Sequence, residues 1–284
     1  MTIDCALLRG EEDFRAAGCD TPRLDALVLL AANMKKDKAF LFAHGKEELS
    51  REEETAYEKM RGLRTRGLPV AYIVGKKEFY GLSFYVDERV LVPRPETEVL
   101  VDTALEIIRR EPQSARIHDV CTGTGCVAIA LEHTLSRAGG TRAEISASDI
   151  SPAALEVFRI NCRALLGRLL PHSEADLLAG VPAGLGMITA NPPYVSAGDF
   201  SGMRSRGWPE PELALNGGED GLDIIRRLAA EAADHLGKDG WLVMEGSPEQ
   251  APALRSMLES RSWRDIQFIR DLAGQERVIA ARRP

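Results

Sequence analysis

Apolar residues in the first 70 or so positions recur at helical spacing. One stripe consists of Leu24, Leu27, Val28 and Ala31. Because residues three and four apart share one face of a helix, this stripe predicts an amphipathic helix, and Pro22 suits its first position. The charged segment 47–59 predicts a further, solvated helix. We therefore expect residues 1–74 to form a small helical domain.

The pattern changes after the glycines and prolines at positions 67–75. Residues 78–92 are rich in aromatic and β-branched side chains around Gly81, which favours an extended hairpin. We expect segment 75–92 to link two domains.

From residue 93 to residue 284, short apolar runs alternate with helical stretches. The runs that predict strands are 116–121, 143–148, 186–190, 240–245, 265–270 and 277–281. The stretches that predict helices are 97–110, 126–137, 152–166, 221–236 and 249–260. This alternation is typical of parallel strands with crossover helices, so we expect a doubly wound α/β sheet. A short turn separates the last two runs and favours an antiparallel hairpin.

Composition narrows the class of protein. The 284-residue chain has 44% hydrophobic and 28% charged residues, as ordinary globular proteins do. Its formal net charge of −7 argues against broad nucleic-acid binding. The five cysteines include no C-x-x-C pair, and no two histidines have metal-ligand spacing, so we expect a reducing cytoplasm and no metal. No apolar run reaches the ~18 residues of a membrane helix, and the acidic N-terminal segment is not expected to be a signal peptide.

A glycine-rich segment follows the strand predicted at 116–121. It consists of Cys121, Thr122, Gly123, Thr124 and Gly125. Glycines between a strand and a helix let backbone amides approach a ligand closely. Asp149 ends the next strand, where a carboxylate can accept hydrogen bonds from both ribose hydroxyls of a nucleoside. Asp176-Leu177, at the expected end of the third strand, suits adenine contact. Ordinary explanations remain open: a tight turn for the glycines and a helix cap or loop carboxylate for Asp176.

The strand predicted at 186–190, the fourth if one ends at Asp176-Leu177, leads into Asn191-Pro192-Pro193-Tyr194. An amide or aromatic amine is a poor nucleophile because its lone pair is delocalised. Two acceptors on its N–H bonds would orient the nitrogen and localise that lone pair. The Asn191 oxygen can be one acceptor and a carbonyl of the Pro-Pro stretch the other, and Tyr194 can lie flat against a planar group. The segment predicts a site that presents an NH2 group to a methyl donor, without choosing between glutamine and adenine; a Pro-rich turn is the alternative.

Further signatures extend along nearly the whole chain. They are segments 67–75, 78–81, 92–98, 149–155, 210–222 and 271–278, together with the Asn-Pro-Pro-Tyr segment. With them, the sequence resembles the release factor glutamine N5-methyltransferase family, known as HemK or PrmC. The Asn-Pro-Pro-Tyr segment is shared with DNA adenine methyltransferases, whereas 92–98 and 217–222 are much more specific.

The resemblance implies a class I S-adenosylmethionine methyltransferase fold, Rossmann-like, with a seven-stranded, mainly parallel sheet. The implied domains are a substrate-recognition helical bundle at 1–74, a linking hairpin at 75–92 and a methyltransferase domain at 93–284. The implied reaction transfers a methyl group from S-adenosyl-L-methionine to N5 of the glutamine in the Gly-Gly-Gln motif of peptide chain release factors. It leaves S-adenosyl-L-homocysteine, and no direct DNA binding is expected.

Residue roles carry over by position. Segment 121–125 would wrap the methionine part of the cofactor, Asp149 would bind the ribose, and Leu177 would lie by the adenine. Residues 191–194 would hold the glutamine amide. Two departures stand out: Cys121 where the family often has glycine, with Thr124 where serine is common, and an unusual segment at 244–248. A cysteine fits the turn if its φ is negative, so we expect that φ and intact cofactor binding.

Three other functions stay open at this point. A related branch methylates a glutamine of a ribosomal protein, but the N-terminal segment favours release factors. Adenine N6 methylation of DNA is disfavoured by the negative charge and the absence of a basic recognition domain. A cofactor-binding regulator without catalysis is disfavoured by the intact Asn191.

Overall fold

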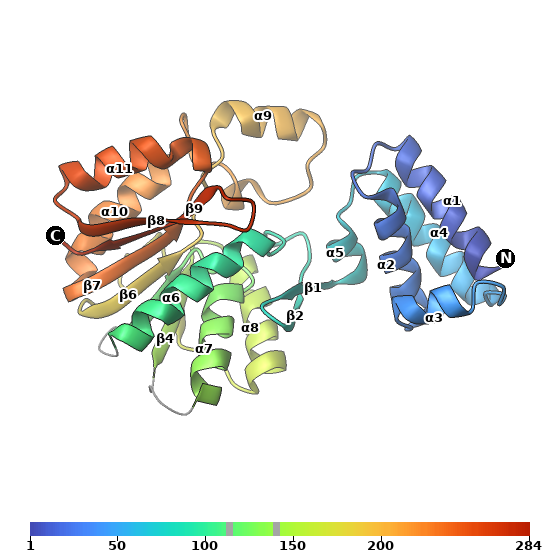
Figure 1. The fold of residues 1–284 in the computed structure, drawn as a ribbon, viewed down its shortest axis with the longest axis horizontal. Helices are drawn as coiled ribbons and strands as arrows, with labels where there is room; N and C mark the ends of the chain where they lie inside the picture. Colours follow the sequence, from blue (N-terminus) through green and yellow to red (C-terminus); the bar gives the residue numbers. More distant parts are fainter. Residues whose placement is uncertain (112–115, 139–142) are drawn as a thin grey trace. The chain divides into compact units, whose positions relative to one another are not determined.

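The computed structural model describes residues 1–111, 116–138 and 143–284 (Figure 1). They form two compact units. The first comprises Met1–Lys76 with Arg206–Pro209, and the second comprises Lys77–Ser205 with Glu210–Pro284. Among these described residues, no helix has both the length and the apolar character that crossing a membrane requires.

The first unit is helical. Its helices are α1 (Ile3–Ala16), α2 (Pro22–Met34), α3 (Lys38–Ala43), α4 (Arg51–Thr65) and α5 (Val70–Val74). Phe14 of α1, Leu30 of α2 and Tyr57 of α4 are fully buried in a core of their own. The charged helix begins at Arg51 rather than at residue 47, because Ser50 and Glu53 form a capping box there.

From Lys76 onward, strands and helices alternate, which confirms the predicted α/β class. The strands are β1 (Lys76–Phe79), β2 (Leu82–Tyr85), β3 (Arg116–Val120), β4 (Glu144–Asp149), β5 (His172–Glu174), β6 (Leu185–Ala190), β7 (Leu236–Glu245), β8 (Arg264–Arg270) and β9 (Glu276–Arg282). The helices are α6 (Glu98–Arg110), α7 (Cys126–Ala138), α8 (Pro152–Leu166), α9 (Ala197–Ser205), α10 (Asp223–His235) and α11 (Ala251–Ser260). Short 3₁₀ helices lie at Pro95–Thr97, Glu212–Ala214 and Pro248–Gln250.

Within the described residues, seven strands form one sheet in the order β5-β4-β3-β6-β7-β9-β8. The neighbours from β5 to β7 are parallel, and β9 is antiparallel to both β7 and β8. The order reverses between β3 and β6. Val120 pairs with Ala190 and Ala190 with Met244, so the residues that follow these three lie side by side at the carboxyl edge. Open α/β sheets bind their ligands at such a reversal.

Helices cover both faces of the sheet (Figure 1). On one face, α6 and α8 bury Leu105 and Phe158, and on the other α10 buries Leu228. Phe79 and Phe84 of the β1–β2 hairpin belong to the core of the first face. The predicted hairpin is therefore present, and it is packed into the second unit.

Two elements differ from the sequence prediction. The third strand, β5, has only three polar residues, so no apolar run marks it. Helix α9 is not predicted by the sequence pattern, because Gly198 and Gly202 lower its helix propensity. The antiparallel pairing of β8 and β9 is confirmed.

Candidate active site

A cavity of about 510 Å³ lies within the second unit, beyond the carboxyl ends of the parallel strands. Asp119 and Asp149 line it at the ends of β3 and β4, and Asn191 lines it directly after β6. Small-molecule sites have volumes of about 300–1,000 Å³, so the cavity is of the right size for a nucleoside-type ligand.

The glycine-rich turn after β3 forms one wall. Its cavity-lining residues are Cys121, Thr122, Gly123 and Thr124. A Cβ at Gly123 would meet no atom of the described residues within 4 Å, which leaves space for a ligand to approach the backbone. Gly125 has a different role, since a Cβ there would lie 2.6 Å from the ring of Phe158. Gly125 is therefore required for packing behind the cavity rather than for lining it.

Cys121 departs from the expectation. Its φ is 56°, so the expected negative φ is wrong. This left-handed region favours glycine and costs a residue with a Cβ about 1–2 kcal/mol. The thiol packs against the apolar core beneath α10, and burial, reinforced by the nearby charges of Asp149 and Asp119, raises its pKa. Cys121 is therefore a neutral packing group on a strained backbone.

Two backbone amides hold the Asp149 carboxylate in place. Gly123 N donates to Oδ2 at 2.8 Å, and Ser151 N donates to Oδ1 at 2.9 Å. Burial raises the pKa of Asp149, and these hydrogen bonds oppose the shift. Each carboxylate oxygen has a further lone pair, so Asp149 can still accept from two hydroxyls of a ligand.

Asp176 and Leu177 follow β5 and line the same cavity. Leu177 is buried and offers an apolar surface. Asp176 is half-exposed and forms an ion pair with Arg227, another cavity residue, at 2.8 Å. The structure thus brings both predicted adenine contacts to the site, with the Asp176 charge already paired.

Asp119 joins three segments of the site. Thr122 of the turn donates to Oδ2 at 2.6 Å, and Thr189 of β6 donates to Oδ1 at 2.7 Å. The side chain is 1% exposed, and burial raises its pKa to about 6. Asp119 therefore fixes the glycine-rich turn to the strand that leads into Asn191.

The Asn-Pro-Pro-Tyr segment places two of its four residues on the cavity. Asn191 and Pro193 line it, whereas Pro192 and Tyr194 do not belong to its lining. Asn191 Nδ2 donates to Thr97 Oγ1 at 3.2 Å, and nothing in the described ranges donates to its Oδ1. The carbonyls of Pro192 and Pro193 likewise receive no hydrogen bond from the residues that the structure describes. The acceptors that the sequence predicts therefore have no donor among the described residues.

Tyr194 is anchored to a buried carboxylate. Its hydroxyl donates to Glu245 Oε1 at 2.8 Å, and Thr97 Oγ1 donates to Oε2 at 2.7 Å. Glu245 is fully buried at the end of β7. Burial raises the pKa of Glu245, which its two hydrogen bonds oppose; burial and the Glu245 charge also raise the pKa of Tyr194. Tyr194 stays protonated and holds the segment, and its flat contact with a substrate stays a prediction.

Segment 217–222 supports the Asn-Pro-Pro-Tyr backbone from another direction. A Cβ at Gly217 would lie 2.7 Å from the carbonyl oxygen of Pro193 and 2.8 Å from the Cα of Tyr194. Gln250, at the end of the 3₁₀ helix Pro248–Gln250, donates to the carbonyl of Tyr194 at 3.0 Å. This close backbone contact explains the glycine at position 217.

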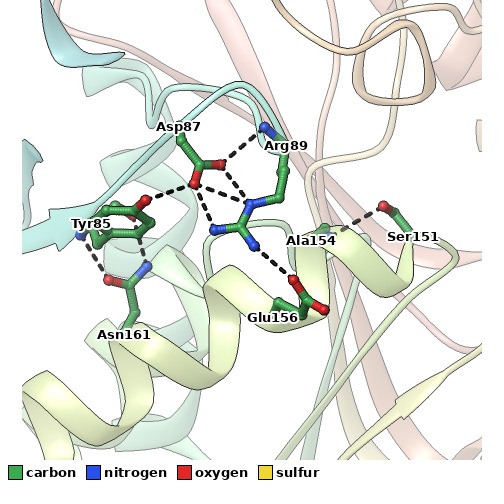
Figure 2. A network of polar contacts seen from close by, with 7 residues as sticks. All are labelled: Tyr85, Asp87, Arg89, Ser151, Ala154, Glu156 and Asn161. Atoms are coloured by element: carbon green, nitrogen blue, oxygen red, sulfur yellow. Dashed lines mark hydrogen bonds and ion pairs between the residues drawn. The ribbon is translucent and has the colours of Figure 1, made fainter. Parts of the chain in front are cut away.

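The segment after β2 forms a further wall, and Figure 2 shows how it is attached to α8. Tyr85 N donates to Asn161 Oδ1 at 2.7 Å. Arg89 pairs with Asp87 at 2.6 Å and with Glu156 of α8 at 2.7 Å. Because Arg89 lines the cavity, these bonds hold the segment at the edge of the ligand site.

Glu210 attaches the next residues of this wall. Val92 N donates to its Oε1 at 2.9 Å, and Arg94 forms an ion pair with its other oxygen. Glu210 is 5% exposed and belongs to the loop that precedes the cavity residues Pro211 and Leu213. The role of segment 92–98, which the sequence does not specify, is therefore structural in part.

Sequence reasoning missed Thr97, Asp119 and Glu245. A usable signal exists for Glu245, which follows the apolar run 241–244 at the end of β7, whereas Asp119 stands in a strand that also contains Arg116 and His118. No local signal marks Thr97, whose partners lie 94 and 148 residues away in sequence.

Comparison with known proteins shows the family of this chain. Residues 6–75 match the family model described as the PrmC N-terminal domain. The chain is 36% identical to the release factor glutamine methyltransferase of Koribacter versatilis over 287 aligned positions, which cover 100% of this chain and 99% of that protein. The chain belongs to the release factor glutamine methyltransferase family. The release factor glutamine methyltransferase of Deinococcus radiodurans is 38% identical to this chain over 267 positions, which cover 94% of this chain and 93% of that protein.

The fold of this family member also occurs in more distant enzymes. The solved hMettl16 catalytic domain, in complex with the MAT2A 3′UTR hairpin 1, has a TM-score of 0.54 at 16% identity. The match covers 84% of this chain and 83% of that chain, and it concerns the fold alone. The seven-stranded methyltransferase sheet predicted from the family resemblance is therefore confirmed.

Proposed function

We propose that this protein transfers the methyl group of S-adenosyl-L-methionine to N5 of the glutamine in the Gly-Gly-Gln motif of peptide chain release factors. The observation that carries the proposal is the position of Asn191. It lines the same cavity as the glycine-rich turn and Asp149, and no described residue donates to its Oδ1. The names of the relatives state the same activity.

The residues of the cavity fit the methyl donor. We assign its methionine part to segment 121–125, its ribose to Asp149 and its adenine to Leu177, with Asp176 beside the ring. Open space at Gly123, free lone pairs on Asp149 and the apolar surface of Leu177 support this assignment. When bound, the donor supplies an electrophilic methyl group on sulfur, and transfer leaves S-adenosyl-L-homocysteine.

The chain's own contribution is to orient the nucleophile. Asn191 Oδ1 and a carbonyl of Pro192 or Pro193 accept the two N–H bonds of the glutamine amide. Held this way, the nitrogen lone pair is less delocalised and points toward the donor, and positive charge that develops on nitrogen is stabilised. The methylated nitrogen is acidic and loses its proton to water. These steps need no metal, because acceptors on the protein fill each role.

The proposed substrate also sets the cellular location. Release factors act in translation, so we place the protein in the cytoplasm. Their recognition by the helical unit at 1–74 is part of the proposal, and DNA binding is not.

Labelled methyl transfer to purified release factors tests the proposal. Wild-type factor should take up label, whereas a factor with alanine in place of the motif glutamine should not. Equal labelling of both factors contradicts the proposed substrate. A ribosomal protein in a parallel reaction tests the alternative glutamine substrate.

The Asn191→Ala variant tests the amide-binding site. Loss of one oriented acceptor should lower kcat by roughly 10²- to 10³-fold. Calorimetry with S-adenosyl-L-homocysteine should show nearly unchanged affinity, because the proposed cofactor contacts of segment 121–125 and Asp149 are intact. Turnover close to that of wild type would refute the proposed role of Asn191.

A further inference from the structure

The hydroxyl of Thr97 lies between Asn191 and Glu245 and has a single proton. This proton is donated to Glu245 Oε2, 2.7 Å away, while the Tyr194 hydroxyl donates to Oε1, so both oxygens of Glu245 serve as acceptors. Thr97 Oγ1 then meets Asn191 only as an acceptor. The group of Asn191 that faces it at 3.2 Å must therefore be the NH2 group.

The orientation of the Asn191 amide follows from this arrangement. With its NH2 group bonded to Thr97, Asn191 keeps its oxygen free as an acceptor for a ligand. The reversed amide would present an NH2 group to the NH2 group of the substrate, and two donors cannot form a hydrogen bond. Glu245, which is two hydrogen bonds away from Asn191, thus determines which end of the Asn191 amide faces the substrate.

The arrangement is well protected from competing partners. Thr97 is 1% exposed and Glu245 is fully buried, so solvent does not replace either bond. Tyr194 donates to the second oxygen of Glu245, so both oxygens have a donor. Because Thr97, Asn191 and Glu245 come from three separate segments, their meeting is a feature of the folded site.

We propose that Thr97 and Glu245 are positioning residues for methyl transfer, which hold the Asn191 amide with its oxygen toward the substrate nitrogen. The inference rests on the proposed function. It assigns a task to Thr97, which lines the cavity beside Asn191, and to Glu245 at the end of β7, which does not belong to the lining.

Substitutions at Thr97 test the inference in the full-length protein. Thr97→Val keeps the shape but removes the hydroxyl, and it should lower kcat roughly 10- to 100-fold. KM for the release factor and the Kd of S-adenosyl-L-homocysteine should stay within about twofold. Thr97→Ser restores the hydroxyl and should recover most of kcat.

Thr103→Val is the matched control. Thr103 is buried in α6, six positions further along the chain. Its hydroxyl donates to the carbonyl of Val99 in the same helix at 2.7 Å and has no other partner among the described residues. This variant should keep the wild-type kcat. A similar loss in Thr97→Val and Thr103→Val, or no recovery in Thr97→Ser, would overturn the inference.

Glu245→Gln tests the direction of the hydrogen bonds and does not depend on the Thr97 variants folding. A glutamine can donate to Thr97, which frees the hydroxyl proton to turn toward Asn191 and reverse its amide. We expect kcat to fall at least about 10-fold, with thermal unfolding and cofactor affinity close to wild type. An unchanged kcat would show that the charge does not set the orientation.

The two proposals fail in different ways. If wild-type protein does not label release factors, the proposed function fails. If wild-type protein labels them and both Thr97→Val and Glu245→Gln do so at the wild-type rate, only the positioning role fails.

Discussion

Cys121 carries a side chain in a backbone conformation that normally selects glycine. Glycine relieves that strain but gains freedom in the unfolded chain, so the two effects partly cancel. We expect Cys121→Gly to exceed Cys121→Ala in free energy of unfolding by about 0.5–1 kcal/mol. Urea denaturation of the two variants measures this difference.

Cys162 provides the matched control, because there alanine should be more stable than glycine. It is buried in the interior of α8, where the backbone is helical. There Cys162→Gly should be less stable than Cys162→Ala by about 1 kcal/mol. If alanine is the better residue at both positions, Cys121 is not strained.

Asp119 makes stability depend on pH. Burial raises its pKa from 3.8 to about 6, so the folded state holds its proton more tightly than the unfolded state does. Its stabilising contribution is complete below pH 3.8 and is lost as pH rises through about 6. At about 1.4 kcal/mol for each factor of ten in proton affinity, the loss totals roughly 3 kcal/mol.

The comparison of wild type with Asp119→Asn isolates this effect. The free energy of unfolding of wild type minus that of the variant should fall by roughly 2 kcal/mol between pH 4 and pH 7. Denaturant titrations at several pH values give the difference directly. A difference that is independent of pH would mean that Asp119 titrates normally in the folded protein.

Among the elements, segment 217–222 and the Asn-Pro-Pro-Tyr segment touch backbone to backbone. A Cβ at Gly217 would lie 2.6 Å from the carbonyl oxygen of Gly221 and 2.7 Å from that of Pro193. Pro193 lies two residues after Asn191, so displacement of its carbonyl would shift Asn191. We therefore expect Gly217→Ala to lower kcat at least about 10-fold through misplacement of Asn191.

Gly198→Ala is a control from the same part of the chain. Gly198 lies in α9, and within the described part of the chain a Cβ there would meet only Ser196 Oγ, at 3.9 Å. This substitution should leave kcat unchanged and slightly raise stability, since alanine favours a helix. Equal kcat values for both glycine variants would show that the contact at Gly217 does not position Asn191.

How much of the site could be predicted from sequence depends on where its residues stand relative to the strands. Asp149 and Asn191 terminate or follow strands, and parallel strands bring their carboxyl ends to one edge, so spacing alone placed them together. Thr97 bonds to Asn191 and to Glu245 across 94 and 148 residues of sequence, and no local pattern encodes these two contacts. The φ of Cys121 was predicted wrongly because the turn imposes it and residue type alone does not.

At the scale of the molecule, the two units have separate apolar cores. The core of the first unit consists of side chains from residues 1–74, among them the fully buried Phe14 and Tyr57. We therefore expect a fragment of residues 1–76 to be helical and to unfold cooperatively, with a stability of at most about 3–5 kcal/mol. Circular dichroism during heating measures this, and Tyr57→Ala should abolish the transition by leaving a cavity of aromatic size.

The position of the cavity allows a second, independent test on the full-length chain and the fragment. Every residue that lines it belongs to the second unit. At about 100 times its Kd, S-adenosyl-L-homocysteine should stabilise the full-length chain by about 2.7 kcal/mol, because it binds the folded state. The melting temperature of the 1–76 fragment should not change with the same addition. A fragment without a cooperative transition would show that the helical unit depends on the rest of the chain for its stability, and a ligand-induced shift in the fragment would place part of the cofactor site there.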